Sequence, residues 1–388
     1  MRILVYEFAS GGGFAGRPVV ASLAREGRAM RDALVEDLAS IGRHEIVMTT
    51  DPRFAQGAPP GVAVVPIGPR RALLPDDLLS SVDAVWLIAP ETDGCLERLA
   101  LSVERKGKTL FGPGSSAIRC ASDKERLPRR LARCGVAHPQ THPLRAGESA
   151  AAIAERLGYP IVVKPRLGAG CEGVRLARDR RELATAIQNA AHSQMWRRAS
   201  ALRSRSPEGL RHDSHLKNSL APCGHDYRIL LQQYVRGVAA SVSLISDGRR
   251  AVALSVNAQA VRASPAFSYR GGCTPLDHPL AGRAIEAAIR TCEALPNLRG
   301  YVGIDLVLTD AEAIVIEVNP RLTTAYLGVR SAMNGENIAA MAIDACRGKL
   351  PTPPRIGKSV QFTSSGRVVS TPLVPSSWFD GLTASARS

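Results

Sequence analysis

The stretch AIVIEVNPRLTTAY, residues 313–326, carries the side chains best suited to chemistry. Its aliphatic, β-branched start is typical of a buried strand, where a glutamate is costly unless a nearby charge compensates it. Glu317 therefore needs a cation. Asn319 lies two residues further on, so strand alternation turns its side chain to the same face as Glu317. Together these two residues predict half of a ligand site.

The other half of this site is predicted on the preceding strand. Asp305 lies in GIDLVL, and a turn near Asp310 would fold that strand back beside Glu317 and Asn319. Two carboxylates and one amide oxygen suit a hard cation such as Mg²⁺, which keeps waters and takes its remaining ligands from phosphates. The alternative is that each carboxylate only pairs with an arginine.

A lysine and a glycine-rich turn predict a phosphate site. Lys164 ends the buried run IVVK, where an ammonium needs an anion to stay charged. In the following turn, PRLGAGCEGV, backbone amides can approach a phosphate without side-chain obstruction. The glycines that allow this are Gly168, Gly170 and Gly173. A β-turn beside a lysine with no binding role is the alternative.

Two further segments carry weaker signals. SDKERL fits a capping box with Ser122 as the N-cap and Glu125 three residues later, which puts Lys124 on the first turn of a helix. A surface role is the default for such a lysine. The segment LLQQYV, residues 230–235, either offers main-chain groups to a purine edge or belongs to the core.

Positioning these residues requires several blocks of structure. In residues 1–114, strand-like runs alternate with helical ones, which predicts an α/β fold with a parallel sheet. Residues 115–235 form a second block, with strand, glycine-rich turn and strand. Residues 236–350 form a third, with a hairpin at Asp247-Gly248. Residues 351–388, rich in Pro and Ser, predict a tail with a loosely held end.

Composition favours a soluble globular protein of two or three subdomains. The chain has 388 residues, of which 45% are hydrophobic and 22% charged. The N-terminus is typical of a first strand instead of a signal peptide, and no apolar run is long enough for a bilayer. The eight cysteines include no CxxC pair, so we expect reduced thiols and a cytoplasmic location.

The net charge of +15 comes largely from dispersed arginines. The densest basic segment, residues 195–217, has poor periodicity and predicts a solvated, mobile insertion. Aromatic residues make up only 4% of the chain, which argues against nucleic acid as a partner. We expect no membrane partner either. A positive surface agrees with acidic small-molecule substrates.

These pieces, in this order, resemble the ATP-grasp superfamily over residues 1–349. The matching segments are SDK, VVKP, LGAGCEGV, QQYV and EVNPR, together with Asp305. The resemblance implies an N-terminal pre-ATP-grasp domain followed by two α+β subdomains that clamp ATP. It also implies that the glycine-rich loop is a lid, and it allows a homodimer.

The resemblance also implies roles for single residues. Residues implied to bind ATP are Lys124, Lys164, Gly168, Gly170, Gly173, Gln233, Tyr234 and Val235. Asp305, Glu317 and Asn319 would hold Mg²⁺, with Mn²⁺ as an alternative. Catalytic roles fall on Arg321, Arg262 and Lys164. The sequence departs from the family in having Gln233 where many members have glutamate, and Gly303-Ile304 where some have an arginine before the first metal ligand.

The implied reaction is ATP-dependent amide formation through an acyl phosphate, from a small-molecule carboxylate and an amine. The segments EVNPRLTTAYLGV, QQYVRGVAASVSL and SYRGGCTPL are most similar to the tyramine–glutamate ligases of methanofuran biosynthesis and their bacterial counterparts. Glutamate with tyramine or tyrosine would then be the substrates. The segment FSYRGG, residues 267–272, would be a substrate loop with an aromatic, a cation and two permissive glycines, or else a surface turn. Residues implied to contact the substrates are Tyr269, Arg270, Gly271, Gly272 and Thr323. Thr324 either faces the substrate too or caps a helix. Another ATP-grasp ligase, a carboxylase subunit and a non-catalytic basic binding module are the alternatives.

Overall fold

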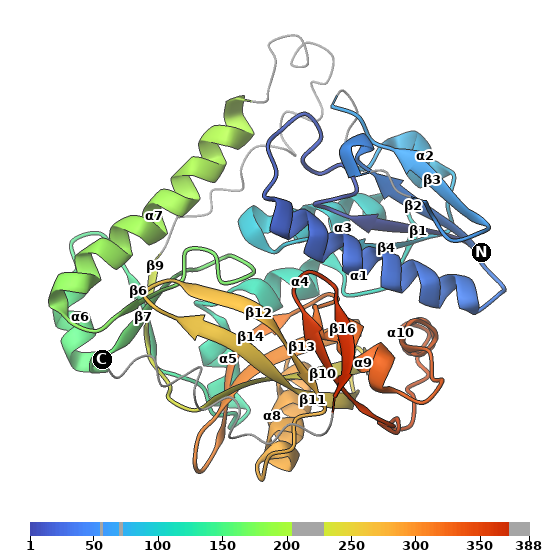
Figure 1. The fold of residues 1–388 in the computed structure, drawn as a ribbon. Coiled ribbons are helices and arrows are strands. Elements are labelled where there is room, and N and C mark those ends of the chain that lie inside the picture. The colour runs from blue at the N-terminus through green and yellow to red at the C-terminus, as the bar shows by residue number, and fades with distance from the viewer. Residues whose placement is uncertain (55–56, 70–72, 204–228, 372–388) are drawn as a thin grey trace.

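The N-terminal part of the chain forms a five-stranded parallel sheet, as predicted. The structure is a computed structural model that describes residues 1–54, 57–69, 73–203 and 229–371. The strand order is β3-β2-β1-β4-β5 (Figure 1). The strands are β1 (Arg2–Glu7), β2 (Glu45–Thr50), β3 (Val62–Pro66), β4 (Ala84–Ile88) and β5 (Thr109–Leu110). Residues 3–6 of β1 are fully buried, because helices cover both faces of a parallel sheet.

Three helices connect the strands of this sheet, and two more lead from it into the second block. The N-terminal helices are α1 (Ala21–Ser40), α2 (Asp76–Ser80) and α3 (Cys95–Arg105), with 3₁₀ turns at Pro52–Phe54 and Thr92–Gly94. Helices α4 (Ser115–Ser122) and α5 (Leu127–Arg133) form the connection. Because β1 and β4 run parallel, the loops that follow them both lie at the carboxyl edge of the sheet, where ligands of such sheets bind.

The second sheet has four antiparallel strands in the order β6-β9-β7-β8. They are β6 (Thr141–Leu144), β7 (Ile161–Pro165), β8 (Arg175–Ala177) and β9 (Ile229–Gln233), with helices α6 (Ala150–Leu157) and α7 (Arg180–Arg203). Helix α7 runs through residues 195–203, so the first part of the predicted mobile insertion is helical. The rest, residues 204–217, lies outside the described residues.

The third sheet has seven strands in the order β14-β13-β10-β11-β12-β15-β16, all paired antiparallel. They are β10 (Val238–Asp247), β11 (Ala251–Ala263), β12 (Phe267–Thr274), β13 (Arg299–Leu308), β14 (Ala313–Asn319), β15 (Ser359–Thr363) and β16 (Val368–Thr371). The hairpins predicted at Asp247 and Asp310 are present. Strands β15 and β16 extend the sheet where we predicted only a tail, because each pairs by main-chain hydrogen bonds that need no strong sequence pattern.

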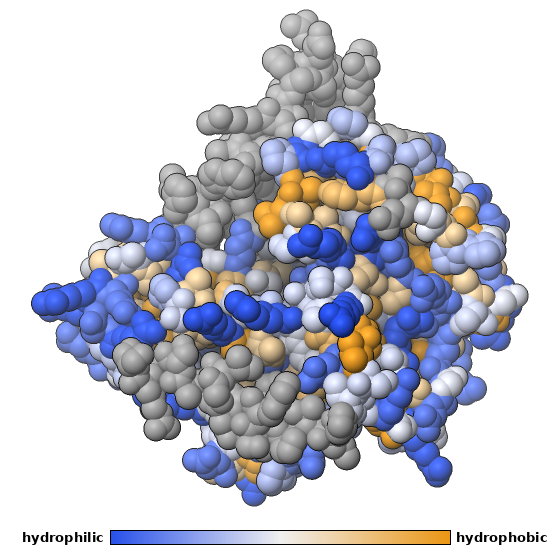
Figure 2. All heavy atoms as spheres, in the orientation of Figure 1, coloured by the Kyte–Doolittle hydropathy of each residue, from blue (hydrophilic) through white to orange (hydrophobic). Residues whose placement is uncertain are grey.

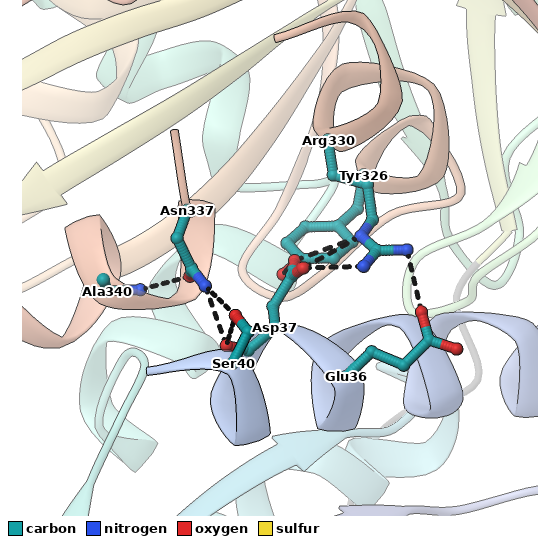
Figure 3. A network of polar contacts seen from close by, with 7 residues as sticks. All are labelled: Glu36, Asp37, Ser40, Tyr326, Arg330, Asn337 and Ala340. Carbon is teal, nitrogen blue, oxygen red and sulfur yellow. Dashed lines mark hydrogen bonds and ion pairs between the residues drawn. The ribbon is translucent and has the colours of Figure 1, made fainter. Parts of the chain in front are cut away.

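The N-terminal domain is joined to the third block by helices. These are α9 (Ala325–Ala332) and α10 (Ile338–Cys346), which share a buried apolar cluster with α1 and β1, whereas α8 (Ala281–Glu293) packs on the third sheet. Asp37 on α1 accepts hydrogen bonds from the Tyr326 hydroxyl and, at 3.0 and 2.7 Å, from the Arg330 guanidinium (Figure 3). Asn337 donates to the Asp37 carbonyl oxygen at 2.7 Å. The network fixes the N-terminal sheet against the helices that follow Arg321.

The face shown in Figure 2 is mostly hydrophilic, with smaller apolar patches. The large apolar side chains exposed among the described residues are Met1, Val20, Val64, Leu73 and Val369. Within those residues, none of the helices combines the length and apolar character needed to cross a membrane. The seven cysteines described carry free thiols, and Cys223 lies outside the described residues.

Candidate active site

The β13–β14 hairpin brings the three predicted metal ligands together. Asp305 lies opposite Glu317, and Gly303 lies opposite Asn319. The Asn319 amide donates to Asp305 Oδ2 at 2.9 Å. Gln259 on β11, which the sequence analysis did not identify, donates to Asp305 Oδ1 at 2.9 Å. Each oxygen of the Asp305 carboxylate is therefore fixed in place.

The electrostatics of this hairpin fit a bound cation. Burial, followed by the charge of Glu317, raises the pKa of Asp305 to about 7, although Asn319, Gln259 and Arg321 act in the opposite direction. Two partly buried carboxylates that repel each other are stabilised by a cation, and their oxygen donors suit Mg²⁺. The described residues contain no group of three His, Cys, Asp or Glu that could bind a metal. Asp305, Glu317 and the amide oxygen of Asn319 are three donors, which would leave positions at Mg²⁺ for phosphate oxygens and water.

Both predicted lysines lie beside this hairpin. Lys124 Nζ is 3.2 Å from Glu317 Oε2 and donates to the carbonyl oxygen of Gly168 at 2.6 Å. Lys164 is almost fully buried. Burial and the nearby charge of Lys124 lower the pKa of Lys164 to about 8, while Glu317 opposes this shift. Glu317 is thus the anion that the sequence analysis required near Lys164.

Lys124 lies in a turn, and not on the first turn of a helix capped by Ser122 as predicted. Ser122 ends helix α4, and α5 begins only at Leu127. Between them, Asp123 Oδ1 accepts from the backbone N–H of Glu125 at 3.1 Å. Asp123 also accepts two hydrogen bonds from Arg166, at 2.9 and 2.6 Å. The predicted capping box was wrong, because the side chain that binds free N–H groups here is that of Asp123, which Arg166 holds in place within a turn between two helices.

The glycine-rich loop between β7 and β8 lies over the site. Gly170, Cys171 and Gly173 have φ angles of 64°, 62° and 71°, in the left-handed region that glycine adopts without cost. Burial, followed by the charges of Glu317 and Asp305, raises the pKa of Cys171 to about 12. The loop tip therefore lies near the carboxylates. Its far end is tied to the β11–β12 turn, because the Leu176 N–H donates to Pro265 O at 2.9 Å.

Arg321 is held by a glutamate from the N-terminal domain. Its Nε lies 2.9 Å from Glu91 Oε1, and its Nη2 donates to Glu91 Oε2 at 3.1 Å. Glu91 is only 3% exposed. Glu91 was not predicted as a site residue from the sequence, because 230 residues separate it from Arg321. Its position just beyond β4, at the carboxyl edge of a parallel sheet, was the available signal.

Two of the predicted substrate residues lie near this centre. The Thr323 hydroxyl is 3.3 Å from that of Tyr301. Burial raises the pKa of Tyr269, with further contributions from the charges of Glu26 and Asp305. Glu26 on α1 also accepts a hydrogen bond from the hydroxyl of Thr324, the residue before α9. Thr324 makes no side-chain cap bond to that helix.

The segment FSYRGG is a strand and not the predicted loop. Gly271 and Gly272 lie in β12 between β11 and β15, and a Cβ at either would come within 2.0 Å of a carbonyl oxygen of the neighbouring strand. Their small size serves strand packing. Arg262 and Arg270 are exposed, and Arg262 has no hydrogen bond or ion pair with any described residue. The structure thus does not connect Arg262 with the carboxylate hairpin.

The three residues predicted beside adenine lie between two sheets. Gln233 ends β9 with an exposed side chain, and its N–H donates to Gln140 O at 2.9 Å. Tyr234 and Val235 are half-buried and lead from β9 to β10. This connection between the second and third sheets can present main-chain groups to a planar ligand, and its role stays a prediction.

Three family models match successive parts of the chain. A pre ATP-grasp 3 domain matches residues 44–118, the ATP binding domain of the carbamoyl-phosphate synthase L chain matches 123–212, and an ATP-grasp domain matches 208–325. The fold is that of a mixed α/β protein with a parallel N-terminal sheet followed by two antiparallel sheets. Residues 208–325 thus match an ATP-grasp domain, the segments before them match two domains of related proteins, and the fold is shared with a solved ATP-grasp superfamily protein.

Similar proteins include a curated ligase and two solved structures. A tyramine–L-glutamate ligase of Methanocaldococcus fervens is 30% identical over 33% of this chain and 44% of its own length. The match thus spans less than half of that relative. A putative ATP-grasp superfamily protein from Archaeoglobus fulgidus (24% identity, TM-score 0.62) aligns over 93% of this chain and 92% of its own. An L-amino acid ligase from Bacillus licheniformis (16% identity, TM-score 0.61) aligns over 93% and 78%.

Proposed function

We propose that the protein is an ATP-dependent carboxylate–amine ligase that releases ADP and phosphate. One observation carries the proposal. A single hairpin places two carboxylates and an amide beside two lysines and the glycine-rich loop, and Arg321 adds its charge to the same carboxylates. This combination of charges suits a triphosphate with a divalent cation next to a reacting carboxylate.

The proposed reaction has two steps. A carboxylate oxygen of the substrate attacks the γ-phosphorus of ATP, and the bond to the ADP oxygen breaks, which gives an acyl phosphate. The nitrogen of a neutral amine then attacks the acyl carbon, inorganic phosphate leaves, and the nitrogen loses a proton. Because phosphoryl transfer passes through a loose transition state, the protein acts mainly by positioning and by neutralising charge.

The side chains divide this work between them. Lys124 and Lys164 contact the phosphates, and the loop from Gly168 to Gly173 covers them and excludes water. Asp305, Glu317 and Asn319 would hold Mg²⁺, which when bound offsets the charge of the triphosphate. Arg321 is the cation next to the reacting group. Its guanidinium cannot turn freely, because Glu91 holds it through two nitrogens.

Glutamate and tyramine are the substrates that we propose, in a pathway to a methanofuran-type one-carbon carrier. The tyramine–L-glutamate ligase matches support this choice, as does the net charge of +15, which favours an acidic substrate. ATP-dependent ligation of two amino acids is the second candidate, since an L-amino acid ligase shares the fold.

The experiment is ADP release with MgATP, L-glutamate and tyramine, each left out in turn, with mass spectrometry of the products. The proposal predicts an amide and ADP in the full mixture only. Replacement of tyramine by each of the twenty amino acids tests the second candidate. Absence of substrate-dependent ADP release in every mixture would refute the ligase assignment.

A further inference from the structure

A charged cavity of about 290 Å³ lies next to the active site, between the N-terminal domain and the start of the glycine-rich loop. This volume is close to the lower limit of the range for small-ligand pockets, about 300–1,000 Å³. Residues from three elements line it: Glu91 and Glu97 after β4, Arg119, Ser122 and Arg126 from the α4–α5 region, and Arg166 after β7.

Two residues of the cavity wall, Glu91 and Asp123, connect it with the proposed phosphate site. On one side, Glu91 binds Arg321. On the other side, Asp123 in the cavity wall immediately precedes Lys124, whose ammonium contacts Glu317 and the glycine-rich loop. A small molecule in the cavity would thus contact Glu91, which binds Arg321, and Asp123, which precedes the lysine that we assign to the phosphates.

The cations of the cavity differ in how fully they are paired. Arg166 is engaged by both oxygens of Asp123, at 2.9 and 2.6 Å. Arg126 has only a 3.5 Å ion pair with that same carboxylate, and its side chain is 70% exposed. Because Asp123 already binds Arg166 through both oxygens, the charge of Arg126 is available to a ligand anion.

Ser122 supplies a second, independent observation. Its residue is only 5% exposed, and its Oγ has no hydrogen-bond partner among the described residues. A buried hydroxyl without a partner is costly, and a ligand acceptor in the cavity would satisfy it. An exposed guanidinium and a buried hydroxyl donor in one cavity suit a carboxylate.

We infer that this cavity binds the carboxylate substrate, with Arg126 and Ser122 donating hydrogen bonds to a carboxylate that does not react. The inference rests on the proposed function and adds the binding site of its acidic substrate. The ligand is thus a dicarboxylic amino acid such as L-glutamate, one of whose two carboxylates is held in the cavity while the other reaches the phosphate site.

Calorimetric titration of L-glutamate into the full chain, saturated with Mg²⁺ and a non-hydrolysable ATP analogue, tests this inference. The variants Arg126→Ala and Ser122→Ala should each weaken glutamate binding about tenfold or more, as expected for the loss of a hydrogen bond to a charged group. The matched control is Arg129→Ala, which removes the same charge from an exposed residue of α5 outside the cavity. It should bind glutamate like the wild type.

Tyramine has no carboxylate, so its binding should be the same in Arg126→Ala as in the wild type. Unchanged glutamate affinity in both cavity variants, or no glutamate binding by the wild type, would overturn the inference. The proposed function is judged separately, by ADP and amide formation with the wild type. Amide formation together with unchanged affinity in the cavity variants would refute the cavity site alone.

Discussion

Replacement of Glu91 by glutamine tests whether the N-terminal domain positions the reaction centre. In the wild type, both oxygens of Glu91 face Arg321 nitrogens, at 2.9 and 3.1 Å, and Glu91 is 3% exposed. Glutamine keeps the shape and one acceptor oxygen. Its side chain carries no charge and its amide nitrogen cannot accept a hydrogen bond, so the ion pair with Arg321 is lost and at most one hydrogen bond remains.

The expected fall in kcat follows from the lost contact between residue 91 and Arg321. A hydrogen bond to a charged group contributes about 1.5–3 kcal/mol. If about 2 kcal/mol of this positions Arg321 in the transition state, kcat falls about 30-fold, since about 1.4 kcal/mol corresponds to a factor of ten. The KM for ATP should change little, because Glu91 has no contact with the lysines that we assign to the phosphates.

Steady-state ADP release measures both constants, and urea unfolding of the same preparation shows how much of the variant is folded. The conservative variant Glu91→Asp keeps the charge and should recover part of kcat. A Glu91→Gln protein that is folded and has a kcat within about twofold of the wild type would refute the positioning role of Glu91.

Three further outcomes are expected. Glu317→Gln should lower the rate of ADP release by at least about a hundredfold, because the substitution removes a charge at the cation site. Its urea unfolding should stay close to that of the wild type, because glutamine keeps the shape. Turnover at the wild-type rate would contradict the role of the hairpin. Asp37→Asn should destabilise the protein by about 3 kcal/mol in urea unfolding, since it breaks a largely buried ion-pair network. The control is Glu36→Gln, which removes an exposed ion pair and should cost less than about 1 kcal/mol. Equal losses of stability in the two variants would contradict this prediction. Arg53 holds the pKa of Asp51 below its usual range, so this pair stabilises the fold above about pH 4 and the stabilisation is lost as the pH falls through the lowered pKa. Arg53→Gln should therefore be less stable than wild type at pH 7, by about 1 kcal/mol, with a difference that narrows towards pH 3 in urea unfolding; a constant difference would be the contrary result.

The sequence predicted the carboxylate hairpin because its signals are local. Strand alternation, a turn near Asp310 and the acids at Asp305 and Glu317 all lie within fifteen residues or so. The same holds for Lys164 and its glycine-rich turn. Such features depend on the period of the strand and on the conformational freedom of glycine, and both can be read directly from the residues.

Other features depend on contacts between distant segments. Glu91 meets Arg321 only when the parallel sheet docks against the third block. Gly271 and Gly272 were interpreted as part of a substrate loop because an aromatic residue, a cation and two permissive glycines stand together there, whereas close neighbouring strands require these glycines. Strands β15 and β16 were missed because a short strand added to a sheet edge is specified mainly by backbone pairing.

The most direct test of the central claim is the mass of the product formed from MgATP, L-glutamate and tyramine, measured together with ADP release. The ligase that we propose predicts a compound with the mass of the two substrates less one water, formed with one ADP per amide and absent when any component is omitted. ADP release without this amide would contradict the substrate assignment. The absence of both in every mixture would contradict the ligase itself.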